Sequence, residues 1–588
     1  MAKAIEVTGL TVAVRGGAPI ISDVSLHLDS GEVMGVVGES GSGKSTLALA
    51  LLGFARPGAS ITSGSVTIDG RDLLSLPDAQ LRAMRGRTVA YVPQDPATAL
   101  NPSLSLATQL TEGLDADRSR ALATVRELLV AVGLPSDDAF LRRRPRELSG
   151  GQQQRVAIAM AMAAAPRLIV FDEPTTGLDV STQARVLELV RDLCHSRRMA
   201  AVYVSHDLAV VAEVADAVTV MYAGEIVESG PSMRVITRPT HPYTRALLDA
   251  VPSMAARHRL VPIPGRAAGV GEIDQGCRFV SRCTFAVDAC HHTHPPLTLV
   301  DADTDVRCLR ATDVAAAART SQRISDERVD VPGEQPALAV SRLAAGYAGR
   351  QILFDVSFEL GRGECLAVVG ESGSGKTTMS RCLIGLHEEQ TGEFQFEGAP
   401  MPALASRRSD DMRRGLQYVF QNPYGSLNPR KTIEASLTLP LQHFFGVDRD
   451  EARQRAADAL ERVEIPARYA QRYAADLSGG QRQRVAIARA LVCEPRVLLC
   501  DEVTSALDVS VQASVIELLR SLLDEGLSMV FVTHNLAVVR SIADKVVVLN
   551  KGHLVESGPT EAVLSAPTHD YTRALMADTL DVPEARSA

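Results

Sequence analysis

Two glycine-rich loops that could bind phosphate stand out in this 588-residue chain. Residues 38–45 read GESGSGKS and residues 370–377 read GESGSGKT, and both match the pattern G-x-x-x-x-G-K-[ST]. A strand-like apolar run precedes each loop and a helix-forming run follows it, so backbone N–H groups and a helix N-terminus should converge on a phosphate. A glycine-rich turn without a ligand is the alternative, and two copies in the same context argue against it. The sequence therefore predicts two nucleotide-binding sites.

The side chains of these loops are the candidate ligands of ATP and Mg²⁺. Lys44 and Lys376 are expected to contact the β- and γ-phosphates, and Ser45 and Thr377 to offer their hydroxyl groups to Mg²⁺. The candidate ATP-binding residues of the two loops are Gly38, Ser40, Gly41, Gly43, Lys44, Ser45 and Thr46 in the first copy, and Gly370, Ser372, Gly373, Gly375, Lys376, Thr377 and Thr378 in the second.

A pair of adjacent carboxylates follows an apolar run further along each copy. Asp172 and Asp501 each end such a run, where a carboxylate can hold the Mg²⁺ shell. The next residues, Glu173 and Glu502, could act as general bases toward the attacking water. A carboxylate at the end of a strand is often only a helix cap or a surface charge. The phosphate-binding loop upstream in each copy favours the catalytic interpretation.

The sequence LSGGQ, at residues 148–152 and 477–481, indicates a further anion site in each copy. Its serine and glycines precede a strong helix-forming run, so bare N–H groups at a helix N-terminus are again available. A simple N-cap followed by glycine is the alternative, but the motif recurs at a matching distance from both phosphate-binding loops. The candidate residues are Ser149, Gly150 and Gly151 in the first copy, and Ser478, Gly479 and Gly480 in the second.

These motifs recur in the same order because the chain contains two copies of one unit. The separation between equivalent motifs is nearly constant, which indicates duplication of a whole domain. Each copy alternates short apolar runs, such as Val33–Val37 and Arg167–Phe171, with helical stretches such as Ser45–Leu52. This alternation is typical of a mainly parallel sheet wrapped by helices.

The composition limits the classes of function. Hydrophobic residues make up 46% and charged residues 22%, as in ordinary globular proteins. The 61 basic and 70 acidic residues give a net charge of −9, and the chain has no Trp, so the composition argues against binding nucleic acid. The longest apolar run, Val156–Pro166, is too short to span a bilayer, and the start, MAKAIEV, lacks the apolar core of a signal peptide. A cytosolic chain, held at a membrane only by a partner, is therefore expected, and its nine cysteines should not form disulfides.

The phosphate-binding loop (P-loop), LSGGQ, the Asp–Glu pair and a later histidine together resemble the ATP-binding-cassette (ABC) ATPases over both halves of the chain. The resemblance implies an α/β fold with two ABC-type P-loop NTPase domains, each with a mainly parallel sheet core, an antiparallel β subdomain and a helical subdomain. The predicted parts are a first cassette at 1–236, a tail with a Cys-rich segment at 237–310, a linker at 311–336, a second cassette at 337–562 and a C-terminal tail at 563–588.

The resemblance also implies that the two cassettes of this one chain pair head to tail. Each ATP would lie between the P-loop of one cassette and the LSGGQ of the other. Further residues match motifs of the family: Gln94 and Gln421 match the Q-loop that senses Mg²⁺ and water and contacts the transport partner, His206 and His534 match the switch histidine that steadies the γ-phosphate, and Asp179 and Asp508 match the D-loop that bridges the two sites.

One position departs from the family pattern. Tyr347 stands where such proteins stack an aromatic ring on adenine, whereas Val14 occupies the matching place in the first copy. Adenine stacking is therefore expected in the second site and is in question in the first.

Other segments resemble the dipeptide and oligopeptide importer branch of this family. They are QDPATALNP at 94–102, QNPYGSLNP at 421–429, and the tails RPTHPYTRALL at 238–248 and APTHDYTRALM at 566–576. The resemblance implies an ATP-hydrolysing subunit on the cytoplasmic face of a membrane. Its partners would be two membrane-spanning permeases and, indirectly, an external solute-binding protein, with no nucleic acid. Peptides are the leading solute class, although relatives also carry nickel, glutathione or sugars.

Four cysteines, at 277, 283, 290 and 308, form a Cys-rich segment after the first cassette. This segment resembles one in importer ATPases that holds an iron–sulfur cluster in some members. Four thiolates can hold a [4Fe–4S] cluster, and tetrahedral Zn²⁺ or unliganded thiols are the alternatives. Nearby His291, His292 and His294 could bind metal or be solvated loop residues. The cysteines in apolar runs are expected in the core: Cys194, Cys365, Cys382, Cys493 and Cys500.

Two other classes of function remain as alternatives. A tandem-cassette ATPase that acts on ribosomes or nucleic acid would favour a long basic linker or a coiled-coil insertion, and this chain is acidic with a Cys-rich connection. A metal or redox sensor built on the cysteines would leave two intact ATPase motif sets unexplained.

Overall fold

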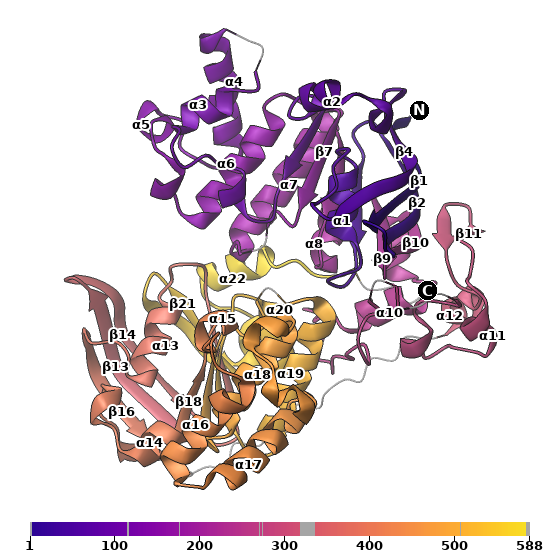
Figure 1. Ribbon diagram of the computed structural model, residues 1–588. Helices are drawn as coiled ribbons and strands as arrows, with labels where there is room; N and C mark the ends of the chain where they lie inside the picture. Colours follow the sequence, from indigo (N-terminus) through magenta and orange to yellow (C-terminus); the bar gives the residue numbers. More distant parts are fainter. Residues whose placement is uncertain are drawn as a thin grey trace.

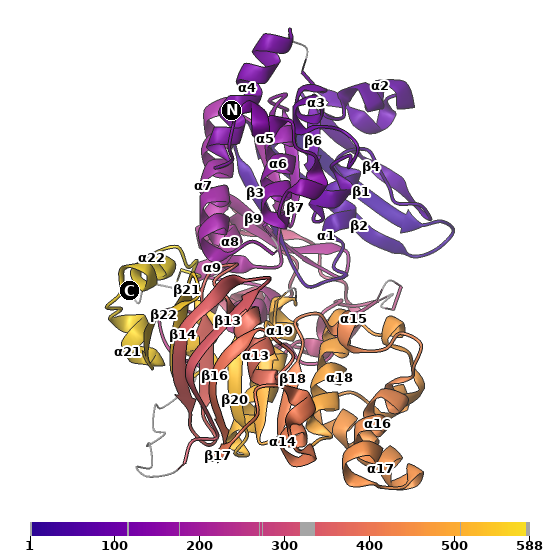
Figure 2. The same cartoon turned by 90° about the vertical axis from the view of Figure 1, so that its left-hand side faces the viewer.

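The computed structural model describes residues 3–114, 117–175, 177–269, 271–272, 275–317, 335–505 and 507–583. In Figures 1 and 2 the first cassette, in indigo and magenta, lies against the second, in salmon to yellow. The tail that follows the first cassette lies beside both of them, on the right of Figure 1.

Each cassette is built on a sheet whose central strands are parallel, as predicted. The first sheet has the order β11-β12-β10-β9-β3-β8-β7-β6, and parallel pairs join β3 to β8 and β9, and β7 to β6 and β8. Its strands are β3 (Val33–Val37), β6 (Val89–Val92), β7 (Leu168–Asp172), β8 (Ala200–Val204), β9 (Ala217–Tyr222), β10 (Glu225–Pro231), β11 (Thr298–Asp301) and β12 (Thr304–Val306). Strands β11 and β12 come from the tail, so the tail extends this sheet, which the sequence did not predict.

The second sheet repeats the first without that extension. Its order is β18-β19-β20-β15-β21-β22, with β21 and β22 antiparallel. Its strands are β15 (Cys365–Val369), β18 (Leu416–Val419), β19 (Val497–Asp501), β20 (Ser528–Val532), β21 (Lys545–Asn550) and β22 (His553–Pro559). Every residue of β15, β19 and β20 is buried, which explains their continuous apolar sequences.

A separate four-stranded antiparallel sheet flanks each core, as the family resemblance implied. The orders are β2-β1-β4-β5 and β14-β13-β16-β17. The strands are β1 (Lys3–Val14), β2 (Pro19–Asp29), β4 (Ala59–Ile68) and β5 (Arg71–Asp72), then β13 (Leu338–Tyr347), β14 (Arg350–Leu360), β16 (Gln390–Phe396) and β17 (Ala399–Pro400).

Helices cover the sheets and form a helical subdomain in each cassette. Those packed on the first core are α1 (Lys44–Ala50), α2 (Asp78–Met84), α7 (Val180–Arg197) and α8 (Leu208–Val214), and the first helical subdomain has α3 (Leu106–Thr111), α4 (Arg118–Ala131), α5 (Asp138–Leu141) and α6 (Gly150–Met162). The second cassette has α13 (Lys376–Ile384), α14 (Asp410–Gly415), α19 (Val509–Asp524) and α20 (Leu536–Ile542), with α15 (Pro423–Ser426), α16 (Ile433–Phe445), α17 (Arg449–Arg462) and α18 (Gly479–Leu491) in its helical subdomain.

Short helices complete the tails and loops. The tail helices are α9 (Ser232–Thr237), α10 (Pro242–Asp249), α11 (Ala289–His292), α12 (Ala311–Ala316), α21 (Thr560–Ser565) and α22 (Asp570–Ala577). The 3₁₀ turns are η1 (Leu73–Ser75), η2 (Pro96–Thr98), η3 (Pro145–Glu147), η4 (Val280–Arg282), η5 (Ala405–Arg407), η6 (Ala467–Gln471) and η7 (Ala474–Asp476). Helix α12 occupies the start of the expected linker, and residues 318–334 of that linker lie outside the described residues.

The cysteines behave as the composition predicted. All nine are free, and Cys194, Cys365, Cys382, Cys493 and Cys500 are buried in the cores. Across the described part of the chain, no helix has both the length and the apolar character that a membrane crossing needs.

The tail of the first cassette also holds the second cassette. Arg257 Nη2 lies 3.2 Å from Asp544 Oδ1, and Arg259 Nε lies 2.9 Å from Glu517 Oε2. The N–H of Met254 donates to Asp581 Oδ2 at 3.1 Å. These contacts join the two cassettes at a place remote from either P-loop in the sequence.

Candidate active site

Each P-loop folds its lysine back onto its own backbone. Lys44 Nζ donates to the carbonyl oxygens of Gly38 and Glu39 at 2.6 and 2.9 Å, and Lys376 makes the same two bonds to Gly370 and Glu371. Burial lowers the pKa of both lysines, while nearby carboxylates oppose that shift. Each loop thus contains an ammonium group at the position where a phosphate is expected to bind.

The first glycine of each loop has no substitute. Gly38 has φ of 151°, and a Cβ there would lie 2.2 Å from the carbonyl oxygen of Met221. Gly370 has φ of 152° and meets Leu549 in the same way. The loop can approach the neighbouring strand end only because this residue has no side chain.

The aspartate that ends β7 lies beside the hydroxyl of its P-loop, and its counterpart ends β19. Ser45 Oγ donates to Asp172 Oδ1 at 3.1 Å in the first cassette, and burial raises the pKa of both Asp172 and Asp501. In the second cassette Asp501 Oδ1 is buried and has no hydrogen-bond partner among the described residues. Hydroxyl and carboxylate oxygens are the ligands that Mg²⁺ prefers, so these residues fit the ion that accompanies ATP.

A tyrosine that the sequence analysis did not identify fixes each of these aspartates. Tyr91 Oη donates to Asp172 Oδ2 at 2.9 Å, and Tyr418 Oη donates to Asp501 Oδ2 at 2.5 Å. Both tyrosines stand in the strand that leads to the Q-loop, at the same distance before Gln94 and Gln421. The repetition of this tyrosine in both copies was the signal that could have revealed it.

The adjacent glutamate is held between the predicted glutamine and histidine. In the first cassette, Gln94 Nε2 donates to Glu173 Oε2 at 2.9 Å, and His206 Nδ1 lies 3.1 Å from Glu173 Oε1. In the second cassette the equivalent distances are 2.6 Å from Gln421 and 3.4 Å from His534 to the oxygens of Glu502. The structure therefore brings together three residues per cassette that the sequence placed far apart.

The backbone of each glutamate is strained. Glu173 has φ of 51° and Glu502 has φ of 47°, a left-handed conformation that non-glycine residues rarely adopt. Such strain is typical of functional sites. It directs the glutamate side chain to a position that it would not reach from a regular turn.

Charge couples the glutamate to its neighbours. Burial alone would lower the pKa of His206, but the hydrogen bond and charge of Glu173, with Asp207 and Asp508, raise it above 6.5. Burial would raise the pKa of Glu502, but His534, Lys376 and Gln421 lower it overall. Glu502 is thus held as a carboxylate, the form that can accept a proton from water.

One cavity of about 640 Å³ between the cassettes is lined by Gln421, Glu502 and His534 of the second cassette and by Glu173 and His206 of the first, whereas Gln94 and the first P-loop are not part of its lining. Lys376 and Thr377 line it together with Asp179 of the first cassette's D-loop. On the other side, Asp508 Oδ2 accepts the backbone N–H of Ser40 at 3.0 Å. Each P-loop therefore faces the D-loop of the opposite cassette. The remaining predicted lining residues in this cavity are Tyr347, Ser372, Gly373, Gly375 and Thr378.

The LSGGQ residues are not part of this cavity. Ser149 and Ser478 cap α6 and α18, accepting the N–H of Gln152 and Gln481 at 3.3 Å. These serines and the glycines after them are exposed or half-buried. The N-cap interpretation thus describes their local structure. The serines satisfy the N–H groups of Gln152 and Gln481, and an anion could bind only to the other N–H groups of each first turn.

Tyr347 and Val14 differ in their surroundings as well as in type. Both side chains are exposed, and the Tyr347 ring packs edge-on against His387, with centroids 4.6 Å apart. Tyr347 also lines the cavity. Adenine stacking on Tyr347 stays a prediction.

The Cys-rich segment does not form a zinc site. Cys277, Cys283, Cys290 and Cys308 line one small cavity, but no three His, Cys, Asp or Glu side chains of the described chain are arranged to hold a metal ion. Burial raises the pKa of Cys277, that of Cys283 to about 11 and that of Cys308 to about 12, which favours neutral thiols. The described geometry therefore shows neither the iron–sulfur nor the zinc ligation that the sequence led us to expect.

The nearby histidines do not supplement the cysteines. His294 Nε2 lies 2.9 Å from Glu225 Oε1, and His291 and His292 are exposed on α11. The interpretation of His291 and His292 as solvated residues fits their exposure, whereas His294 is engaged by a carboxylate.

We predict that His206 titrates above pH 6.5 and that the Glu173→Gln change lowers its pKa, because burial is then no longer opposed by the Glu173 charge. Below the folded-state pKa His206 is protonated and its ion pair stabilises the fold, and this contribution is lost as the pH rises through that pKa. Imidazole ¹⁵N shifts followed by NMR measure the titration. The exposed Glu188→Gln change is the control, and an unchanged pKa in Glu173→Gln would contradict the assignment.

Comparison with known proteins shows which family the chain belongs to. The ABC transporter family matches residues 21–176 and 353–505, and the family described as "Oligopeptide/dipeptide transporter, C-terminal region" matches residues 227–290 and 555–587. The Glutathione import ATP-binding protein GsiA of Salmonella paratyphi A is 39% identical, over 97% of this chain and 89% of that protein. The Oligopeptide transport ATP-binding protein OppD of Mycobacterium bovis is 38% identical, over 98% of each chain. The solved structure of cbiO1 from Clostridium perfringens has 29% identity and a TM-score of 0.37, over 40% of this chain and 92% of that one. The chain belongs to the ABC transporter family and is an ATPase with two ATP-binding cassettes.

Proposed function

We propose that the two cassettes close on two ATP molecules, each held by the P-loop of one cassette and the LSGGQ of the other. The facing of each P-loop with the opposite D-loop supports this arrangement, since it already sets the cassettes head to tail. Closure would carry the exposed N-termini of α6 and α18 toward the phosphates, where their N–H groups and helix dipoles favour negative charge.

In this proposal, the residues of each site divide the reaction between them. Lys44 or Lys376 leaves its backbone carbonyls and pairs with the β- and γ-phosphates. Glu173 or Glu502 accepts a proton from water as its oxygen attacks the γ-phosphorus, and the bond to the bridging oxygen breaks to release ADP and phosphate. The Mg²⁺ bound with ATP would be held by Ser45 and Asp172, or Thr377 and Asp501, with Gln94 or Gln421, and neutralises phosphate charge. His206 or His534 steadies the γ-phosphate until it leaves.

We propose that this hydrolysis energises an importer of peptides or a related small solute. The relatives named for glutathione import and oligopeptide transport, similar over nearly the whole chain, carry this proposal. The match of both tails to the oligopeptide and dipeptide transporter region supports the same solute class. The partners would be two membrane-spanning permeases, which place this ATPase at the cytoplasmic face of the membrane, and an external solute-binding protein that delivers the solute.

A [4Fe–4S] cluster at the Cys-rich segment is a separate proposal. The proposal rests on one observation, that all four cysteines of the segment line one cavity; among the described residues no three of them are arranged to hold a metal ion. Cys277, Cys283, Cys290 and Cys308 would be its ligands as thiolates. Such a cluster would crosslink the four cysteine positions of this segment.

We predict that the Glu173→Gln, Glu502→Gln double variant binds ATP but hydrolyses it at least about 100-fold more slowly, because both general bases are lost. Nucleotide retention by equilibrium binding and phosphate release measure the two properties. The exposed pair Glu188→Gln, Glu388→Gln is the matched control. Unchanged turnover in the double variant would remove Glu173 and Glu502 from the mechanism.

We predict that the chain, reconstituted in vesicles with its permeases and solute-binding protein, hydrolyses ATP several-fold faster when short peptides or glutathione are added outside. Transported solute causes closure of the cassettes, and closure completes the sites. Phosphate release and uptake of labelled peptide are the measurements, with the glutamate double variant as the inactive control. Stimulation by ribosomes or RNA without permeases would favour the alternative class instead.

We predict about four iron and four acid-labile sulfide per chain in protein purified without oxygen, as four-thiolate ligation requires. Cys290→Ser should lose both, whereas Cys194→Ser, a buried cysteine of the core, should keep them. Metal analysis and visible absorbance check this result. One equivalent of zinc, or no metal at all, would contradict the cluster.

A further inference from the structure

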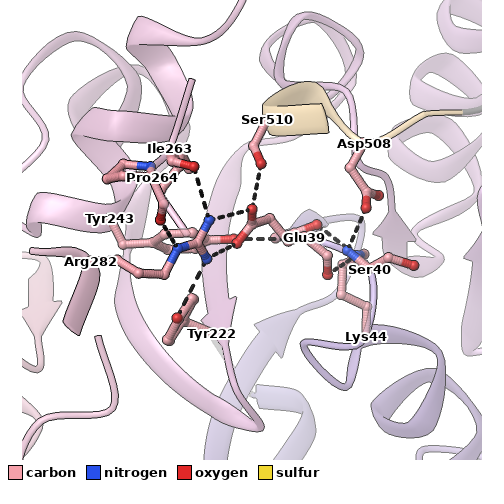
Figure 3. Close-up of polar contacts among 11 residues, drawn as sticks. Glu39, Ser40, Lys44, Tyr222, Tyr243, Ile263, Pro264, Arg282, Asp508 and Ser510 are labelled. Atoms are coloured by element: carbon pink, nitrogen blue, oxygen red, sulfur yellow. Dashed lines mark hydrogen bonds and ion pairs between the residues drawn. The ribbon is translucent and has the colours of Figure 1, made fainter. Parts of the chain in front are cut away.

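The glutamate inside the first P-loop is buried against an arginine from the Cys-rich segment. Arg282 donates from Nη1 to Glu39 Oε2 at 2.6 Å and from Nη2 to Glu39 Oε1 at 3.0 Å (Figure 3). The side chains of Arg282 and Glu39 are only 2% and 9% exposed. A bidentate pair of this kind fixes both the position and the plane of the carboxylate.

The tail holds Arg282 itself in place. Its Nε donates to the carbonyl oxygen of Pro264 at 2.7 Å, and its guanidinium lies 5.8 Å from the centre of the Tyr222 ring and 6.0 Å from that of Phe279. Arg282 ends η4, directly before Cys283. The orientation of Glu39 is therefore set by the segment that carries the four cysteines.

Glu39 is also the point where the second cassette contacts the first P-loop. Ser510 Oγ, on α19, donates to Glu39 Oε1 at 2.5 Å, next to the bond between Ser40 and Asp508 (Figure 3). The backbone of Glu39 is held as well, because its N–H donates to Tyr243 Oη at 2.8 Å and its carbonyl accepts from Lys44. The tail, the P-loop and the opposite D-loop thus meet at one residue.

The second P-loop shares the sequence GESGSGK and lacks this arrangement. The N–H of Glu371 donates to Tyr571 Oη at 2.9 Å, and its carbonyl accepts from Lys376 at 2.9 Å. Its side chain is only half-buried, and no described residue forms an ion pair with it. The difference arises because the Cys-rich segment follows only the first cassette.

We propose that Arg282 is a positioning residue for the first ATP site: through Glu39 it fixes the P-loop around Lys44 and makes nucleotide binding there, but not at Lys376, depend on the Cys-rich segment. The proposal rests on the two ATP sites proposed above. Without Arg282 the buried Glu39 carboxylate keeps only the Ser510 hydroxyl and loses its charged partner, so it is expected to turn toward water and displace the carbonyl that holds Lys44.

The test measures binding of the imido analogue of ATP at one site at a time. A Lys376→Ala background reports the first site, and a Lys44→Ala background reports the second. Arg282→Gln should weaken binding at the first site at least tenfold and change binding at the second by less than twofold. Arg282→Lys keeps the charge but loses the two-pronged guanidinium, so its affinity at the first site should lie between those of the parent and Arg282→Gln. Arg266→Gln, an exposed arginine of the same tail, is the matched control and should change neither site.

A double-variant cycle separates positioning from general damage to the fold. If Arg282 acts through Glu39, the loss of affinity at the first site in the Glu39→Gln, Arg282→Gln double variant is smaller than the product of the two single losses. The double variant also serves if Arg282→Gln alone does not fold, because it leaves no unpaired buried charge. Equal losses at both sites, or independent effects in the cycle, would overturn the role of Arg282. If the Lys376→Ala parent binds no nucleotide, the proposed pair of sites is itself wrong. If the Lys376→Ala parent binds the analogue and the addition of Arg282→Gln leaves the affinity unchanged, only the role of Arg282 is overturned.

Discussion

Each P-loop of this ATPase faces a carboxylate from the opposite cassette, and the rest of the active site depends on that contact. Asp508 accepts the N–H of Ser40, and Asp179 lines the cavity beside Lys376. Burial raises the pKa of Asp508, although Lys44, Ser40 and His206 oppose the shift. In the proposed arrangement, phosphates that arrive beside this partly buried carboxylate would be repelled by it, so ATP binding is expected to rearrange the seam. The same proposal implies that the two sites communicate through this electrostatic conflict, without any long pathway.

The tail of the first cassette joins the two cassettes at a place away from the P-loops. The ion pairs of Arg257 with Asp544 and of Arg259 with Glu517 lie outside the nucleotide cavity. The side chains of Arg257 and Asp544 are mostly buried, so their pair keeps more of its strength than an exposed pair would, whereas Arg259 is half exposed and its pair contributes less. These contacts would keep the cassettes joined through the tail during the rearrangement proposed at the P-loops.

The motifs allowed much of the site to be predicted, because a P-loop fixes its own geometry. The sequence predicted the strand, turn and helix around Lys44, and the copy of this unit at Lys376, from local patterns alone. Tyr91 and Tyr418 were missed, because a tyrosine in a buried strand is usually core and only its contact with the aspartate reveals another role. The left-handed backbone of Glu173 was also missed, because glycine is the residue type that marks this conformation in a sequence and Glu173 is not a glycine.

Two structural features of the tail could not be predicted from the sequence. The spacing of its cysteines predicted a shared site, and the four do line one cavity, but spacing does not determine whether sulfur atoms converge as zinc requires. Nor did any pattern predict that β11 and β12 would extend the first sheet. Both features depend on where the tail docks on the cassette, which is a property of packed surfaces and not of local sequence.

The two sites of a duplicated chain can differ even where their motifs are the same. Both P-loops read GESGSGK, and both fold their lysine onto the same two carbonyls. The difference lies in what covers the loop: Glu39 is enclosed by Arg282 and Ser510, whereas the side chain of Glu371 is half open to solvent. A buried, paired carboxylate holds its loop in one arrangement more firmly than a solvated one, because leaving the pair uncovers two charges. The first loop is thus already ordered by the protein, and the second retains more freedom to adjust to its nucleotide.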